Sequence, residues 1–260
     1  IWAMAERADH PYLKKKQITS LGSRVYKNAL IVPAYKNKKL TSLQFISKDG
    51  DKRFLKGGDI LGASGGIGND TAKIYLTEGF ATAQSIYMCV KPFRCEWAYN
   101  AGNLMLVAKQ LRKKFPESEI IICADNDQWT MINGKQVNTG ELKGIETAKA
   151  INAQYIHPDF PSDDPAKRTD FNDLHCTDGL EYVKNRISEA SCPDSGGVTY
   201  PDVVLESEST PAPNLDFAPI EAYSDYGPSK ELEEAGDWQE LIICDSKGLP
   251  NKTSLKNKIL

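Results

Sequence analysis

The feature that most constrains the fold is a series of short apolar runs between residues 73 and 173, separated by helix-like segments. Two of these runs lead into carboxylates: KIYLT is followed by Glu78, and EIIICA by Asp125 and Asp127. Short strands that alternate with helices predict a small parallel sheet with crossover helices. The functional edge of such a sheet lies where strands end and helices begin. We therefore expect these three acids to lie close together at that edge.

A third acidic cluster, Asp170 and Asp173 in TDFNDLH, begins the last helix-like segment. Hard divalent cations take oxygen ligands, and Mg²⁺ is usually held by one or two carboxylates together with water and substrate phosphate. Carboxylates this close repel one another and have raised pKa values unless cations neutralise them. The three clusters therefore predict one site for a divalent cation, formed by Glu78, Asp125, Asp127, Asp170 and Asp173.

Each cluster also has a purely structural interpretation. Glu78 could be a first-turn acid that is favoured by a helix dipole. The acids of ADND could form a loop that turns and caps the next segment. One of the two acids in TDFNDLH could be the N-cap of the last helix. The order and spacing of all three clusters favour a shared site over three coincidences.

The first part of the chain is basic, although the whole chain carries a net charge of −3. Residues 1–58 contain 13 Lys and Arg against 4 Asp and Glu, whereas residues 59–180 contain 12 against 16. Such an asymmetry suits a protein that holds a polyanion beside a metal site. Three consecutive lysines, Lys14, Lys15 and Lys16, belong to the basic part, and a solvated surface is their alternative interpretation.

Residues 22–58 are expected to be β structure, because their short apolar runs alternate and Asp49-Gly50 is a hairpin signal. In the strand after this turn, Lys52 and Lys56 share one face with Phe54, and Arg53 lies on the other. A basic face that carries an aromatic ring predicts a cradle for a nucleic-acid backbone. An ordinary cross-strand charge pattern is the alternative.

Residues 57–72 are dense in glycine, and GASGGIG within them could be taken for a dinucleotide-binding fingerprint. It precedes an apolar run instead of following one and opens no helix, so we reject that interpretation. The chain also lacks GxxxxGK[ST], and hence a P-loop. We expect a flexible connection between the basic and the acidic parts.

Further along, CEWAYNAG is expected to be a strand that ends at Asn100 and Gly102, and FNDLHCTDGLEYVKNRI a single helix. Asn133-Gly134 predicts a hairpin inserted after ADND. The six cysteines form no CxxC, which argues against a zinc ribbon or a disulfide framework. The three histidines form no ligand spacing.

Composition suggests four regions: a basic N-terminal subdomain (1–72), a catalytic α/β domain (73–190), an acidic Pro/Ser/Gly-rich linker (191–236) and the start of a further domain (237–260). The N-terminus shows no signal-peptide pattern, and no apolar run is long enough to span a membrane. We expect a cytoplasmic location, and a chain that is a piece of a longer protein.

Three motifs, LTEGFATA, ADND and TDFNDLH, together resemble the Toprim domain, which bacterial-type primases, topoisomerases and some nucleases share. Primases are the most similar of these, because VPAYKNKKLTSLQFISKDGDKRFLKGG resembles the basic subdomain that precedes Toprim in DnaG-type primases. The resemblance covers about residues 10–187. FATA, the hairpin after ADND and DFND are similar to primase-helicases of phages, plasmids and integrated elements. HPYLKKKQI resembles the joint after their zinc-binding module, and residues 237–260 resemble the entry of a virulence-associated-E-type helicase domain.

This resemblance implies a small basic mixed α+β subdomain followed by a Toprim-like parallel sheet flanked by helices. It implies a DNA-directed RNA polymerase of primase type, which makes short RNA primers from NTPs on a single-stranded DNA template with Mg²⁺ or Mn²⁺. A replicative helicase domain fused at the C-terminal side is the implied partner. A Toprim nuclease and a non-catalytic module that binds single-stranded nucleic acid are the alternatives.

The resemblance also assigns roles to single residues. Asp125 and Asp127 match the metal-binding pair, and Glu78 matches a metal ligand or proton-transfer group. Asp170 and Asp173 match the third acidic motif, although two acids separated by one residue are more usual there. The remaining matches are the template-groove residues Arg53 and Lys56, the turn residues Asn100 and Gly102, and the phosphate-contacting candidates Gly144 and Lys149.

Overall fold

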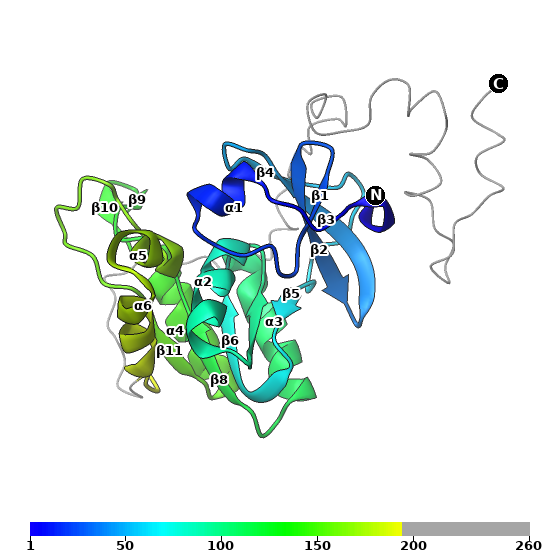
Figure 1. Cartoon of the computed structure of the whole chain (residues 1–260). Coiled ribbons are helices and arrows are strands. Elements are labelled where there is room, and N and C mark those ends of the chain that lie inside the picture. Colours follow the sequence, from blue (N-terminus) through cyan, green and yellow to red (C-terminus); the bar gives the residue numbers. More distant parts are fainter. Residues whose placement is uncertain (194–260) are drawn as a thin grey trace.

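The computed structural model describes residues 1–193, which form a basic antiparallel sheet and a larger α/β part (Figure 1). Almost all of the expected linker, and the whole segment 237–260, lie outside the described residues. Within the described part, no helix is both long and apolar enough to cross a membrane. The α/β class expected from the sequence is confirmed.

The N-terminal sheet is a four-stranded antiparallel meander in the order β1-β2-β3-β4. Its strands are β1 (Arg24–Tyr26), β2 (Ala29–Lys36), β3 (Lys39–Ile46) and β4 (Lys52–Phe54). The expected hairpin connects β3 to β4. Ser47 Oγ accepts hydrogen bonds from the amides of Asp49, Gly50 and Asp51, and Gly50 takes the left-handed φ of 106° that this turn requires. Lys56 lies beyond β4 and is exposed.

A short 3-10 helix η1 (Trp2–Met4) and helix α1 (Pro11–Lys15) precede the sheet. The ring of His10 caps α1, because its Nδ1 accepts from the Tyr12 amide at 3.2 Å while its Nε2 lies 3.1 Å from the Asn28 carbonyl. Pro11 is the first helical residue, where its missing N–H is not needed. This proline therefore starts the helix.

The second sheet has five strands in the order β11-β8-β6-β7-β5. Its strands are β5 (Gly65–Ile67), β6 (Asp70–Thr77), β7 (Phe93–Trp97), β8 (Glu119–Cys123) and β11 (Gln154–Ile156). All neighbours are parallel except β5, which pairs antiparallel with β7. The glycine-dense segment therefore supplies an edge strand, which corrects the expected flexible connection. Gly65 is needed there because an added Cβ would lie 2.2 Å from the Trp97 ring.

Helices cover both faces of this sheet. Tyr75, Cys95, Trp97 and Ile121 face α2 (Phe80–Val90), α5 (Phe171–Asp178) and α6 (Leu180–Ser188). The opposite face, with Ile74, Leu76, Ile120 and Ile122, packs on α3 (Ala101–Lys114) and α4 (Thr139–Ile151). The alternation of strand side chains between two apolar layers explains why these strands read as continuous apolar runs.

Two boundaries differ from those expected. The single helix expected after Asp170 is two, because Gly179 interrupts it with a φ of 91°. The strand expected to reach Gly102 ends at Trp97, since the Asn100 side chain caps α3.

The predicted insert is present as β9 (Met131–Ile132) and β10 (Lys135–Gln136), joined by Asn133-Gly134 with positive φ at both residues. The five cysteines in the described part are free.

Candidate functional site

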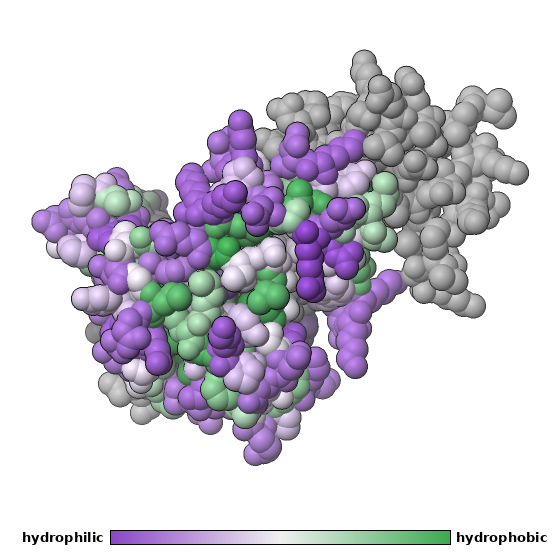
Figure 2. Space-filling model, viewed as in Figure 1, coloured by the Kyte–Doolittle hydropathy of each residue, from purple (hydrophilic) through white to green (hydrophobic). Residues whose placement is uncertain are grey.

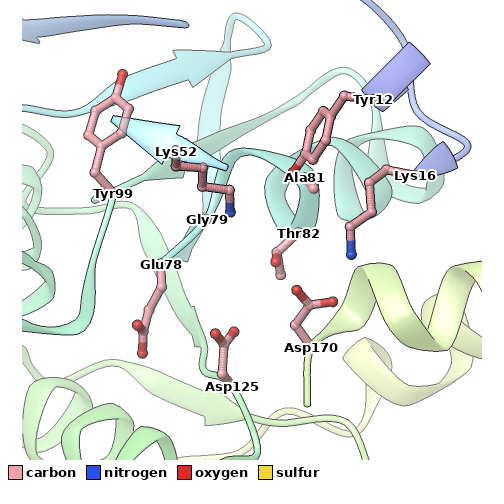
Figure 3. Close-up of a pocket in the computed structure, with 10 residues that line it drawn as sticks. All are labelled: Tyr12, Lys16, Lys52, Glu78, Gly79, Ala81, Thr82, Tyr99, Asp125 and Asp170. Carbon is pink, nitrogen blue, oxygen red and sulfur yellow. The ribbon is translucent and has the colours of Figure 1, made fainter. Parts of the chain in front are cut away.

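A polar pocket of about 140 Å³ lies at the carboxyl edge of the parallel strands, between the α/β part and the N-terminal elements α1 and β4 (Figure 3). Six separate segments of the chain contribute to it. The residues that line the pocket are Tyr12, Lys16, Lys52, Glu78, Gly79, Ala81, Thr82, Tyr99, Asp125 and Asp170. The pocket therefore lies where open α/β sheets place their ligands.

Three carboxylates enter this pocket from three different strand or helix ends. Glu78 follows β6 directly, Asp125 stands two residues beyond β8, and Asp170 is the N-cap of α5. Glu78 Oε1 and Asp125 Oδ1 are buried and have no hydrogen-bond partner among the described residues. Leaving such oxygens without a partner is costly, so the pair is suited to a ligand that supplies positive charge.

The electrostatics of the acids agree with this interpretation. Burial, followed by the charge of Asp127, raises the pKa of Glu78 to about 7, against an ordinary value of 4.5. Burial raises the pKa of Asp125 well above its usual range, and Glu78 and Asp170 add to that effect. The pKa of Asp170 is also raised, by burial first and Asp173 second. Three neighbouring carboxyl groups with raised pKa values form a functional-site candidate.

The acids fit a hard divalent cation only if water and phosphate complete its coordination shell. Within residues 1–193, no group of three or more His, Cys, Asp or Glu side chains is arranged to hold a metal ion by itself. The expected five-acid site is therefore not preformed. Two carboxylates with unpartnered oxygens remain, and Mg²⁺ commonly takes that many from a protein and completes its shell with water and phosphate. Glu78 and Asp125 thus fit the ion as its protein ligands.

The raised pKa of Glu78 leads to a pH prediction for the metal-free protein. An unfolded glutamate loses its proton near pH 4.5, while the folded one keeps it until about pH 7. The folded protein therefore binds the Glu78 proton more tightly than the unfolded chain does. The stability that this proton contributes is fully present below pH 4.5 and is lost as the pH rises through 7. At about 1.4 kcal/mol per pKa unit, the loss is expected to reach a few kcal/mol.

Urea unfolding in EDTA at several pH values, for wild type and Glu78→Gln, measures this effect. The variant has no such proton to lose, so its stability advantage over wild type should grow between pH 4.5 and 7. An advantage that stays constant over this range would show that Glu78 titrates normally in the folded protein.

The other two predicted metal ligands do not line the pocket. Asp127 Oδ2 accepts a hydrogen bond from Thr139 Oγ1 at 3.1 Å, although its charge still acts on Glu78. Asp173 accepts from the Thr169 amide at 3.1 Å and pairs with Lys16 Nζ at 3.4 Å. Of the two acids in TDFNDLH, the N-cap Asp170 faces the pocket, because the carboxylate of Asp173 is occupied by other partners.

Two of the predicted basic residues face the acids. Lys16 and Lys52 point into the pocket from the side opposite Glu78, Asp125 and Asp170 (Figure 3). Lys52 is exposed as a whole residue, but desolvation around its ammonium group lowers its pKa, while Asp170 acts in the opposite direction. Lys52 thus lines the acidic pocket, and its expected contact with a nucleic-acid backbone stays a prediction.

The other basic candidates lie around the pocket on α1 and the β3–β4 hairpin. Lys14 is exposed near Asp9, at 3.9 Å, and Lys15 Nζ donates to the Asp49 carbonyl at 3.4 Å. Arg53 is also exposed. Figure 2 shows hydrophilic residues gathered over α1 and the β4 hairpin. This surface is compatible with the predicted grip on a polyanion.

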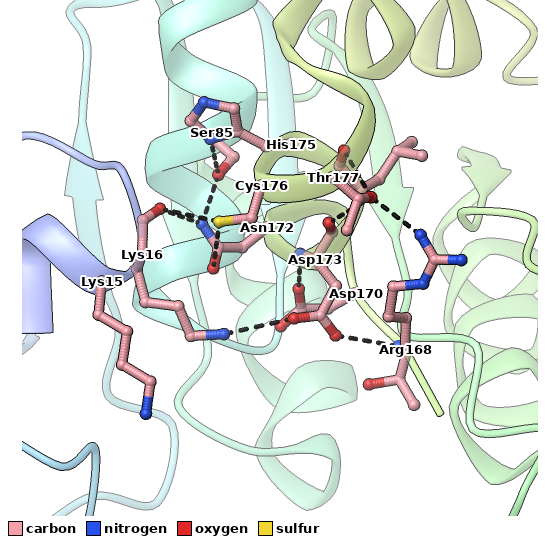
Figure 4. A network of polar contacts seen from close by, with 12 residues as sticks. Lys15, Lys16, Ser85, Arg168, Asp170, Asn172, Asp173, His175, Cys176 and Thr177 are labelled. Carbon is pink, nitrogen blue, oxygen red and sulfur yellow. Dashed lines mark hydrogen bonds and ion pairs between the residues drawn. The ribbon is translucent and has the colours of Figure 1, made fainter. Parts of the chain in front are cut away.

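A buried polar network fixes the end of α1 against α2 and α5 (Figure 4). Asn172 Nδ2 donates to the Lys16 carbonyl at 2.7 Å and to Ser85 Oγ at 2.9 Å. Ser85 Oγ in turn lies 3.0 Å from His175 Nδ1. Because Lys16 is the C-cap of α1, its carbonyl needs a partner outside the helix, and this partner holds the lysine at the pocket.

Four residues expected at or beside the site do not line the pocket. Asn100 caps α3 by accepting from the Asn103 amide, and Gly102 lies in the first turn of that helix. Gly144 is buried, and an added Cβ would lie 2.5 Å from Ala124. Lys149 is exposed in the last turn of α4, which leads away from the acidic edge, so its proposed phosphate contact is not supported.

The sequence analysis missed several residues at the pocket. Tyr12, Thr82 and Tyr99 line it, and the charge of Lys143 in α4 lowers the pKa of Glu78. Only Tyr12 had a usable signal, because it lies four residues before Lys16 and shares its helix face.

No protein-family model matches the chain. A protein named DNA primase TraC, from Escherichia coli, is 32% identical over 164 residues, which cover 58% of this chain and 15% of that protein. A second E. coli protein of the same name is 32% identical over 179 residues, covering 63% of this chain and 12% of that protein. The matched region thus spans at most 15% of the length of these relatives. The chain is thus similar, over 58% to 63% of its length, to proteins named DNA primase, which confirms the predicted resemblance to primases. The Toprim assignment stays a prediction.

Solved structures show a more distant likeness. One chain belongs to a structure of the bacteriophage T7 lagging-strand DNA polymerase interacting with primase domains; it is 14% identical, with a TM-score of 0.45, covering 70% of this chain and 87% of that one. The RNA polymerase domain of Mycobacterium tuberculosis primase DnaG is 11% identical, with a TM-score of 0.43, covering 69% and 60%.

Proposed function

We propose that residues 1–190 form the catalytic core of a Toprim-type DNA primase, which synthesises short RNA primers on single-stranded DNA. The observation that carries this proposal is the pocket in which Glu78, Asp125 and Asp170 face Lys16 and Lys52. The similarity to DNA primase TraC supports it. Residues 1–72 would grip the template, and residues 73–190 would carry the acids. A mobile element as the source, a fused helicase domain and a cytoplasmic location remain predictions.

The residues of the pocket would have different roles in nucleotidyl transfer. Glu78 and Asp125 would hold Mg²⁺ or Mn²⁺, which supplies charge stabilisation for the attacking 3′-oxygen and the leaving pyrophosphate. In the metal-free protein burial raises the pKa of Glu78 to about 7, so binding of the cation near neutral pH would release the proton that Glu78 holds. Lys16 and Lys52, which line the pocket, would offer two ammonium groups to phosphate oxygens. The basic surface of α1 and the hairpin would bind the template backbone.

Metal binding by these acids predicts a metal-dependent stabilisation. At about 100 times its Kd, Mg²⁺ or Mn²⁺ should stabilise the wild-type protein by about 2.7 kcal/mol. Glu78→Gln/Asp125→Asn should abolish this increment, since both proposed ligands are neutralised. Thermal unfolding with and without the metal measures it.

Asp173→Asn is the matched control, because it neutralises a nearby acid that does not line the pocket. Its baseline stability should fall with the loss of the Lys16 pair, but its increment from the metal should persist. If the double variant kept the full increment, Glu78 and Asp125 would not be the metal ligands.

A further inference from the structure

The side chain of Tyr12 has an unusual environment. It is only 2% exposed, lines the pocket and points its ring inward from α1 (Figure 3). Its hydroxyl is buried and has no hydrogen-bond partner within residues 1–193. Buried tyrosine hydroxyls usually have a partner, and the lack of one destabilises the free protein. Phenylalanine would fill the same space without that cost, so packing alone does not account for the hydroxyl.

The surroundings of this hydroxyl indicate the kind of partner that it lacks. Burial, together with Asp170 and Asp173, raises the pKa of Tyr12, so the phenol keeps its proton and acts as a donor. Lys16 lies one turn further along α1, and Lys52 lines the same side of the pocket. A donor beside two ammonium groups, facing the start of α2 at Ala81 and Thr82, is suited to an anionic acceptor.

Resting on the proposed function, we propose that Tyr12 is a substrate-recognition residue, whose hydroxyl donates a hydrogen bond to a phosphate oxygen of the bound substrate. That phosphate belongs either to a nucleoside triphosphate or to the nucleic-acid backbone, since both present the same acceptor. Lys52 lines the same pocket and would contribute its charge to the same phosphate. In the free protein the hydroxyl is held ready by the packing of α1, at a cost in stability.

The test compares Tyr12→Phe with Tyr99→Phe in the full chain. Tyr99 also lines the pocket, but its hydroxyl donates to the Pro33 carbonyl at 2.6 Å. Tyr99→Phe should therefore lower the Tm by a few degrees, because it leaves that carbonyl without its partner. Tyr12→Phe should leave the Tm unchanged or raise it, because it removes only an unpartnered hydroxyl.

Binding is measured by calorimetry with four probes: ATP, inorganic triphosphate, adenosine and a single-stranded oligothymidylate. Tyr12→Phe should weaken binding of the phosphate probe that Tyr12 contacts by about tenfold or more, the effect expected for a hydrogen bond to a charged group. If Tyr12→Phe loses affinity for ATP and triphosphate, the contact is with the nucleotide. If it loses affinity for the oligonucleotide, the contact is with the nucleic-acid backbone. Tyr182→Phe removes a hydroxyl at an exposed position of α6 outside the pocket, so it should bind every probe as wild type does.

Several results would overturn the proposal. The first is a lower Tm of Tyr12→Phe with no change in its affinity for the probes. The second is a loss of affinity that is confined to the probes that contain adenosine. The third is that the wild type binds none of the phosphate probes. Because binding is read without catalysis, a wild type that binds triphosphate but makes no RNA would refute the primase assignment and leave this proposal testable.

Discussion

Replacement of Asp125 by asparagine is expected to reduce primer synthesis at least about a thousandfold, because charge stabilisation of the transferring phosphoryl group is worth several kcal/mol. The same variant should leave the metal-free protein at least as stable as wild type. Asp125 Oδ1 is buried without a partner among residues 1–193, and burial disfavours its charged form, so neutralisation removes a source of strain. A gain or retention of stability combined with a loss of activity is typical of a functional residue.

Asp163→Asn provides the control for this prediction, since it makes the same chemical change at an exposed position. It should keep wild-type activity and stability. If Asp125→Asn retained activity within about tenfold of wild type, the reaction would have to occur elsewhere than in this pocket.

Replacement of Trp97 by alanine is expected to destabilise the protein by about 3–5 kcal/mol, the largest stability effect that the structure predicts. Trp97 is completely buried, lies edge-on to Phe80 at 5.2 Å between ring centroids, and contacts Gly65 and Gly22 so closely that neither could carry a Cβ freely. It thereby joins β7, β5 and α2 beneath the pocket.

Chemical denaturation of Trp97→Ala and Trp97→Phe measures this role. Phenylalanine keeps the ring contact with Phe80 and fills much of the same space, so it should lose much less stability. Equal losses in the two variants would mean that ring volume is not what Trp97 contributes.

The sequence was sufficient to predict the acids at the sheet edge. The alternation of strands with helices predicts parallel strands, and parallel strands place their carboxyl ends at one edge. Glu78 and Asp125 could therefore be predicted to converge without a structure. The choice between Asp170 and Asp173 could not be made, because it depends on Lys16 and Thr169, which only the folded chain brings to Asp173.

Other errors have physical causes of the same kind. The strand at Gly65–Ile67 gives only a weak β signal, because two of its three residues are glycines: Gly65 leaves room for Trp97, and Gly66 for Arg94 and Glu96. Lys52 could be assigned to one face of a strand, but the direction of that face depends on how α1 and β4 dock on the α/β part. Lys149 was misplaced because a helix that follows a strand leads away from the functional edge, so only its first turn can reach the site.

The most direct test of the central claim is to incubate the wild-type chain with a single-stranded DNA template, labelled NTPs and Mg²⁺ or Mn²⁺, and to follow both product and template. The proposed function predicts short, metal-dependent RNA products and an intact template. Degradation of the template without RNA synthesis would contradict it and favour a nuclease. Binding of the template with neither product would equally contradict it and favour a non-catalytic module.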